Sequence, residues 1–183
     1  MAVRRKQVQD LAEAMLERFK PKLKHGRVIC LDKIARDFGI EIIFDEVDDD
    51  LSGFLFRDKK NGRIVIGVNK SHHPNRQRFT IAHELGHFLL HEGETVHFDG
   101  QRGAFTVNLR NSESAKGESD WEREANLFAA EVLMPAKFLA QDLRGKDLDL
   151  LGEDDFLGKL AAKYEVSIQA LTFRLANLGY IEL

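Results

Sequence analysis

Two histidines and a glutamate within five residues form the part of the sequence best suited to chemistry. They are His83, Glu84 and His87, in the segment RFTIAHELGHFLLH at 78–91. Side chains four residues apart project from one face of a helix, so the two imidazoles can reach one tetrahedral metal ion. Glu84 follows the first histidine directly, where a carboxylate can take a proton from a water bound to that ion. The spacing predicts a hydrolytic zinc centre with Glu84 as general base.

A catalytic zinc site needs a third protein ligand and keeps its fourth position open. Cys30 is the only cysteine, so the missing ligand must be a histidine or a carboxylate. Segment 121–134 has helical periodicity, and Glu124 shares its apolar side with Glu131. A carboxylate on an inward-facing side is costly unless it is paired or bound to a metal. We therefore predict Glu124 as the third ligand and expect Glu122 to face solvent.

Other residues near the motif have weaker claims on the site. His91 continues the histidine row by one turn but lies near the helix end, so we predict a helix cap or a hydrogen-bond donor behind the ligands. His72 and His73 could line the cleft or stabilise an oxyanion, although adjacent loop histidines are more often simply exposed. Glu131 is a further candidate for this outer layer. A His-His-Glu set also accepts Mn²⁺ or Co²⁺ in place of Zn²⁺.

The competing interpretation is that the motif is only a polar helix face. Exposed polar faces usually carry Lys, Glu and Gln, whereas Ile81, Leu85 and Phe88 make this helix largely apolar. Polar groups on a buried helix need partners, and a metal would supply them. Gly86 costs about 1 kcal/mol of helix propensity relative to alanine, which indicates close approach by another element.

The elements that must position these residues predict an α+β fold: a small antiparallel or mixed sheet, a zincin-like helix carrying the motif, and helices packed around them. The sequence Asn61-Gly62 between two β-rich runs predicts a hairpin. The polar segment 111–120 is expected to be a surface loop. Helices are expected at 8–19, 31–38, 75–91, 121–134, 136–143, 154–164 and 168–178, and strands at 41–44, 53–57, 63–68 and 104–109.

The segment 160–175 resembles a helix-turn-helix, with Ser167 as the cap of its second helix. Its charge argues against direct nucleic-acid binding, because 154–183 contains three basic and four acidic residues and the whole chain has a net charge of −3. We favour a packing or partner-docking role. The expected organisation is a zincin-like metallopeptidase domain at 1–143 and a small helix-turn-helix-like subdomain at 154–183.

The composition also bears on location. We find no secretory signal and no apolar run long enough to cross a bilayer, so no membrane association is expected. A single cysteine excludes an intrachain disulfide. These features predict a cytoplasmic protein.

The motif at 78–91, followed by EANLFAAEVLMP at 124–135, closely resembles the ImmA/IrrE family of bacterial and phage metallopeptidases. The resemblance implies a zinc centre at His83, His87 and Glu124, with Glu84 as general base. It also implies a protein substrate, typically a helix-turn-helix repressor whose cleavage relieves repression in stress responses or mobile-element regulation. The alternative is a metal-bound sensor module that sequesters a repressor without cutting it.

Overall fold

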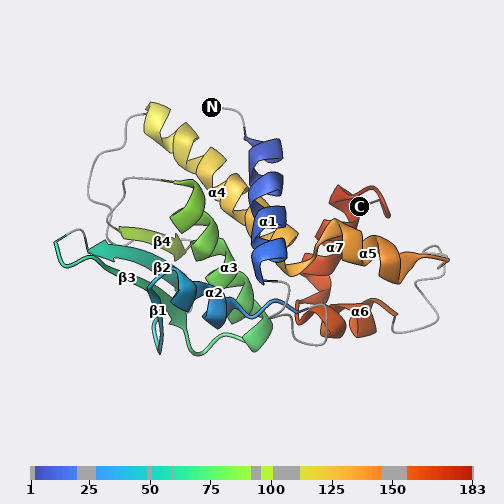
Figure 1. Cartoon of the computed structure of the whole chain (residues 1–183), viewed down its shortest axis with the longest axis horizontal. Helices are drawn as coiled ribbons and strands as arrows, with labels where there is room; N and C mark the ends of the chain where they lie inside the picture. Colours follow the sequence, from blue (N-terminus) through green and yellow to red (C-terminus); the bar gives the residue numbers. More distant parts are fainter. Residues whose placement is uncertain are drawn as a thin grey trace.

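The computed structural model of the chain describes residues 3–19, 28–48, 51–58, 60–91, 96–100, 112–145 and 156–182. It is an α+β structure, with a small mixed sheet at one end and helices α5–α7 at the other (Figure 1). The helices are α1 (Arg5–Phe19), α2 (Leu31–Asp37), α3 (Pro74–Leu90), α4 (Ser112–Leu133), α5 (Ala136–Leu143), α6 (Phe156–Tyr164) and α7 (Ile168–Asn177). Within the described ranges, none of them has both the length and the apolar character needed to cross a membrane.

The sheet has the strand order β1-β3-β2-β4. The strands are β1 (Ile40–Asp45), β2 (Leu51–Asp58), β3 (Arg63–Asn69) and β4 (Val96–Gly100). β1 runs parallel to β3, whereas β2 is antiparallel to both β3 and β4. The predicted β2–β3 hairpin is confirmed, and Gly62 at its turn has φ +68°, a left-handed conformation that glycine adopts readily. Both hairpin strands are interior to the sheet, so its edges among the described strands are β1 and β4.

Two differences from the sequence-based expectations concern segments after α3. The predicted loop at 111–120 is wrong, because α4 already begins at Ser112. Polarity alone misled here, since Glu113, Ala115 and Lys116 are good helix formers. β4 was not expected, because two of its five residues, Asp99 and Gly100, are of types depleted in strands. The strand predicted at 104–109 lies outside the described residues.

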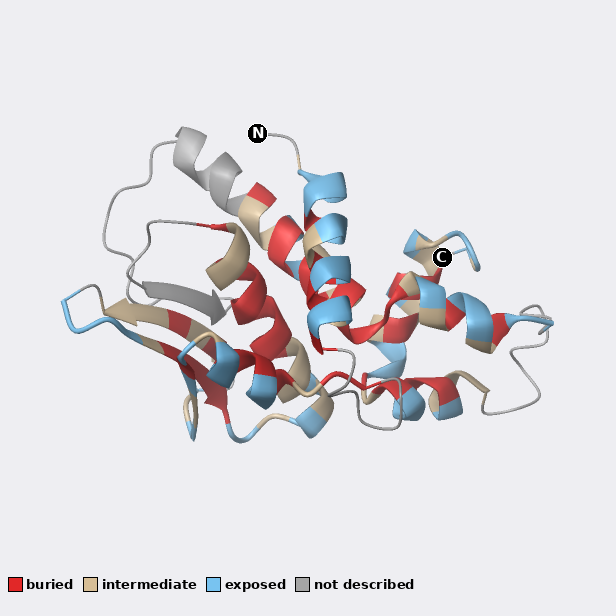
Figure 2. Ribbon diagram, in the orientation of Figure 1, coloured by how far each residue is buried: buried red, intermediate tan, exposed pale blue. Residues whose placement is uncertain are grey.

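Helix α3 packs against β2 and β3 on one side and against α4 on another, and α1 covers α4 (Figure 1). Buried residues follow the facing sides of α3 and α4 (Figure 2). The two helices come very close at Gly86, where an added Cβ would lie 3.1 Å from the Cα of Ala125 and 3.2 Å from Cδ1 of Phe128. The close approach predicted at this glycine is confirmed, and it brings the histidine motif against α4.

The C-terminal helices share the hydrophobic core of the rest of the chain. Leu171 and Leu175 of α7 are fully buried within it. Arg174 is only 4% exposed, and its guanidinium donates to the carboxylate of Glu131 and to the carbonyl of Met134. This arginine therefore faces the protein interior and is not available to a phosphate backbone. The division into a domain at 1–143 and a subdomain at 154–183 stays a prediction.

Candidate metal centre

Side chains fix both ends of α3, and they thereby fix the position of the histidine motif relative to the rest of the fold. At the N-terminus, Nδ1 of His73 accepts a hydrogen bond from the backbone of Asn75, and Pro74 occupies the first turn. At the C-terminus, Arg57 of β2 donates to the carbonyl oxygens of His87 and His91. A cation at this end interacts favourably with the carbonyls of the last turn, where the carbonyl oxygen of His87 also accepts from the backbone N–H of His91.

Three side chains on α3 and α4 converge on one point. The Nε2 atoms of His83 and His87 lie 3.0 Å apart, and each lies 3.3 Å from a carboxylate oxygen of Glu122. Ligand atoms about 2.0–2.1 Å from a tetrahedral zinc ion are separated by about 3.3 Å. The spacing of the three donors therefore fits a single ion of this kind. Both histidines are buried, whereas the Glu122 side chain is 38% exposed, so the cluster opens to solvent on the α4 side.

The carboxylate that lies beside the two histidines differs from the predicted third ligand. Glu122 joins the two histidines, and Glu124, the predicted ligand, does not. Glu124 is buried, as expected, but its charge is balanced by Arg4, whose backbone nitrogen and guanidinium both donate to it. Glu124 thus has a cation beside it, as predicted for a buried carboxylate, but that cation is an arginine from the N-terminal segment.

Glu124 is the outer end of a hydrogen-bond relay that leads to His87. The hydrogen bonds from Arg4 lower the pKa of the Glu124 carboxyl to about 2, so it is ionised and acts as an acceptor. Nε2 of His91 lies 3.1 Å from Glu124 and must carry the hydrogen. Neutral His91 then accepts at Nδ1 from Nδ1 of His87, 3.0 Å away. This arrangement leaves Nε2 of His87 with a lone pair that points to the cluster.

His83 is fixed in the same tautomer by a shorter connection. Its Nδ1 lies 3.1 Å from the side-chain oxygen of Asn126, so Nδ1 carries the hydrogen and Nε2 has the lone pair. Two imidazole lone pairs and a carboxylate oxygen within 4.8 Å of one another repel unless a cation lies between them. Outer partners that set the tautomer of a ligand are typical of metal-binding histidines. The donor set therefore suits a divalent metal.

The remaining residues predicted for the site have different roles. His91, expected as a cap or an outer donor, lies in the relay, and its ring stacks on Trp121 with a centroid distance of 5.0 Å. Glu131 lies farther along α4 and is bound to Arg174 and Gln9. His72 and His73 stay outside the cluster, although His73 lines a pocket beside it.

Glu84 has the position that the motif predicts for it. It is fully buried and follows His83 directly on α3. A carboxylate beside a metal ligand can reach a water molecule at the open position of the ion. Its role as the base stays a prediction.

Sequence reasoning missed Glu122, Asn126 and Arg4. Glu122 and Asn126 are four residues apart and therefore share one face of α4, which is a signal that the sequence contains. A ligand at the open side of a catalytic site can remain partly exposed, so exposure was a poor reason to discount Glu122. Arg4 carries no such signal, because it is 120 residues from its partner.

Comparison with known protein families gives a match over most of the chain. Residues 35–176 match the IrrE N-terminal-like domain of the M78 peptidase family. The chain belongs to this family, and it is a metallopeptidase.

Individual relatives are distant. The chain is 28% identical to an uncharacterized immunity region protein 2 of Bacillus phage phi105, over 77% of this chain and 79% of that protein. It is 33% identical to the metallopeptidase ImmA of Bacillus subtilis over 50% of this chain, and 32% identical to the radiation response metalloprotease IrrE of Deinococcus radiodurans over 62%. These matches span only 47% and 31% of the two proteins.

A solved structure supports the fold alone. A transcriptional regulator of Mycobacterium tuberculosis superposes with a TM-score of 0.55 at 20% sequence identity. The match covers 93% of this chain and 47% of the regulator.

Proposed function

We propose that the protein is a zinc-dependent endopeptidase in which His83, His87 and Glu122 hold the metal and Glu84 is the general base. The observation that carries this proposal is the convergence of two imidazole lone pairs and one carboxylate, at separations that match a tetrahedral ion. Three protein ligands leave a fourth position for water or substrate. That count is typical of catalytic rather than structural zinc.

The mechanism assigns separate tasks to the residues around the centre. A zinc ion in this site supplies a Lewis acid that polarises the scissile carbonyl and acidifies water. Glu84 takes the proton as water attacks the carbonyl carbon, and later gives it to the leaving amine as the C–N bond breaks. Asn126 and the His91–Glu124 relay keep both histidines in the required tautomer.

The variant Glu84→Gln tests the proposal. The variant should retain its metal, because Glu84 is not a ligand, and it should lose peptide hydrolysis by a factor of about 10²–10⁴. Metal content and cleavage of a denatured protein substrate are the two measurements. Glu13→Gln changes an exposed residue of α1 and is the matched control. It should have the same metal content and cleavage activity as the unmodified protein. Undiminished cleavage by Glu84→Gln would contradict the proposed base.

The ligand assignment has its own test. Glu122→Ala should lower the affinity for zinc far more than Glu124→Ala, because the first change removes a ligand and the second removes a distant partner. Titration of the metal-free protein against a chelator of known affinity measures both. A larger loss for Glu124→Ala would restore Glu124 as the ligand.

For the substrate, we propose a helix-turn-helix transcriptional repressor whose cleavage relieves repression. The names of two relatives refer to phage immunity and to a radiation response, which supports a regulatory role but comes from those proteins. Such a substrate is found in the cytoplasm, where the single half-buried Cys30 would stay reduced. Incubation with the repressor encoded beside its gene, read by mass spectrometry, should reveal one defined cut.

The alternative is that the metal-bound protein sequesters a repressor without cutting it. The same variant separates the two functions, because Glu84→Gln keeps the surface and the metal. If it still relieves repression in cells, binding is sufficient. Loss of derepression, with the complex still formed, supports cleavage.

A further inference from the structure

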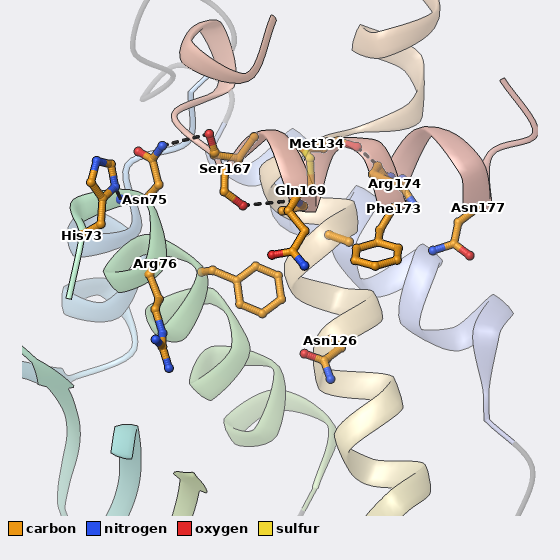
Figure 3. A pocket seen from close by; sticks show the side chains of 14 residues that line it. His73, Asn75, Arg76, Asn126, Met134, Ser167, Gln169, Phe173, Arg174 and Asn177 are labelled. Carbon is orange, nitrogen blue, oxygen red and sulfur yellow. Dashed lines mark hydrogen bonds between the residues drawn. The ribbon is translucent and has the colours of Figure 1, made fainter. Parts of the chain in front are cut away.

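A pocket of about 680 Å³ lies between α3, α4 and α7, beside the metal centre (Figure 3). This volume is typical of ligand-binding sites in proteins. Two of its lining residues also contact the centre: Asn126 is bonded to His83, and the ring of Phe79 stacks on that histidine at a centroid distance of 6.4 Å. Asn126 and Phe79 therefore lie between a ligand in the pocket and the ring of His83.

The pocket wall is mainly apolar, with a few amide groups. Gln169, Phe173 and Asn177 project from α7 toward the space between α3 and α4, spaced four residues apart on one helix face (Figure 3). Amide side chains can both donate to and accept from a peptide main chain, while the apolar surface takes a side chain. The apolar lining consists of Phe79, Ala130, Met134, Val166, Ala170 and Phe173.

The charged side chains that line the pocket are all basic. None of its lining residues, all within the described part of the chain, is an aspartate or a glutamate. The charge of Arg174 is balanced by Glu131 behind the wall. Arg76, at the α3 side, is exposed and donates to a neutral partner, the hydroxyl of Ser52, at 2.8 Å. An acidic group near Arg76 would complete this end of the pocket.

We infer that this pocket is the specificity subsite of the enzyme. It binds a bulky apolar side chain, such as leucine, methionine or phenylalanine, close to the bond that is cut, and an acidic residue of the same extended segment lies against Arg76. The inference rests on the proposed peptidase function. Phe173 is the specificity-determining residue of the apolar wall, and the Arg174–Glu131 pair holds that wall in place.

Cleavage profiling tests the apolar part of the inference. The zinc-loaded protein is incubated with a peptide mixture from a digested proteome, and the residues around each cut are read by mass spectrometry. We expect large apolar residues to be enriched at one position, and Phe173→Ala to lower kcat/KM for such peptides about tenfold. Ala130→Phe, which fills the pocket, should have a similar effect.

The chain offers a matched control for Phe173. Phe44 on β1 is 49% exposed, Phe173 is 52% exposed, and Phe44 does not line this pocket. Phe44→Ala therefore removes the same amount of partly exposed ring elsewhere and should leave the profile unchanged. Melting temperature and metal content confirm that each variant is folded and loaded. Equal profiles for Phe173→Ala and Phe44→Ala would overturn the inference and leave the peptidase function standing.

Charge reversal tests the acidic part. Arg76→Glu should replace the preference for aspartate or glutamate at the flanking position by a preference for lysine or arginine. Arg144→Glu, an exposed change at the end of α5 outside the pocket lining, should leave that preference as it is. An unchanged preference in Arg76→Glu would overturn this part.

A binding measurement separates failure of the subsite from failure of the peptidase function. Octapeptides with benzoylphenylalanine at the central position and mixed residues elsewhere are irradiated with zinc-loaded Glu84→Gln, and the cross-links are mapped. Cross-links to α7 and to Met134 support the subsite even if no peptide is ever cut. Cross-links elsewhere, or a dimer that Phe173→Ala dissociates, would overturn it, and the dimer would identify a second copy as the occupant.

Discussion

Two buried glutamates of α4, Glu124 and Glu131, are each bonded to an arginine, but the two pairs have different surroundings. Glu131 is bound by Arg174, which is itself only 4% exposed, and the pair joins α7 to α4. Glu124 is bound by Arg4, whose side chain is 39% exposed, and it also accepts from His91. Glu131 therefore belongs to a buried contact between two helices, whereas Glu124 is connected through His91 to the candidate metal centre.

The comparison shows that burial and pairing do not distinguish a structural carboxylate from a functional one. Both glutamates are buried and both are neutralised. The two carboxylates differ in their other partners, because only Glu124 also orients an imidazole. We therefore expect changes at the Glu131 end to affect mainly folding stability, and changes at the Glu124 end to affect mainly metal affinity.

The largest effect is expected for Arg174→Leu. Removing this arginine leaves Glu131 buried without its cation, which should lower the free energy of unfolding by about 3–5 kcal/mol. Urea denaturation measures the loss. The double variant Glu131→Leu/Arg174→Leu should recover most of it, because replacing a whole buried pair by apolar groups is often neutral. A loss below 1 kcal/mol in the single variant would contradict a structural role for this pair.

Arg4→Ala should mainly weaken metal binding. Without Arg4, Glu124 no longer has a fixed ionised partner, and the tautomer of His91 and His87 is less well defined. Loss of such outer partners typically lowers metal affinity about 10–100-fold. Chelator competition measures the affinity, and Trp121, the only tryptophan and stacked on His91, reports it by fluorescence. Arg5→Ala, the adjacent exposed change, is the control, and an equal loss there would remove the special role of Arg4.

Gly86→Ala tests how closely the metal end of α4 must approach α3. The added methyl group would lie 3.1 Å from a backbone atom of Ala125. Overpacking typically costs about 1–3 kcal/mol, and alanine regains about 1 kcal/mol of helix propensity. We expect a net stability loss of about 0–2 kcal/mol, with metal affinity lowered because the histidines move away from Glu122. Unchanged affinity would show that the helices adjust freely.

The smallest effect is expected at an exposed carboxylate, which provides a baseline for the two buried ones. Hydrogen bonds from Asn61 lower the pKa of Asp58 in the hairpin turn. Because the pKa of Asp58 is lowered, its ionised form stabilises the folded protein at pH values above the ordinary pKa near 3.8. This stabilisation is lost as the pH falls below that value. Asp58→Asn should therefore be slightly less stable than the unmodified protein at pH 7, and the difference should shrink toward pH 3. Equal stability of the two proteins at pH 7 would contradict this prediction.

Local patterns predicted much of the fold. The hairpin, the helix with His83 and His87, and the cap at Ser167 depend on residues close in sequence, and all three are present. The polar start of α4 was misread as a loop, because polar helical turns and loops have similar compositions. β4 was missed because Asp99 and Gly100 are uncommon in strands.

The site was predicted only in part, for a different physical reason. The two proposed histidine ligands and the proposed base lie within about one helical turn, so their spacing reveals them. The choice between Glu122 and Glu124 depends on which of them meets Arg4, and that contact joins residues 120 positions apart. Burial requires that a carboxylate have a cation nearby, but it does not say whether that cation is a metal or an arginine.

The contact between Arg4 and Glu124 also has a consequence for how the enzyme is made. The two partners are 120 residues apart in the sequence, so Glu124 is translated well after Arg4. Contacts of such sequence separation form late, because the intervening chain must first be closed into a loop. The hydrogen-bond relay behind His87 therefore cannot form until α4 has been translated and has docked against α1.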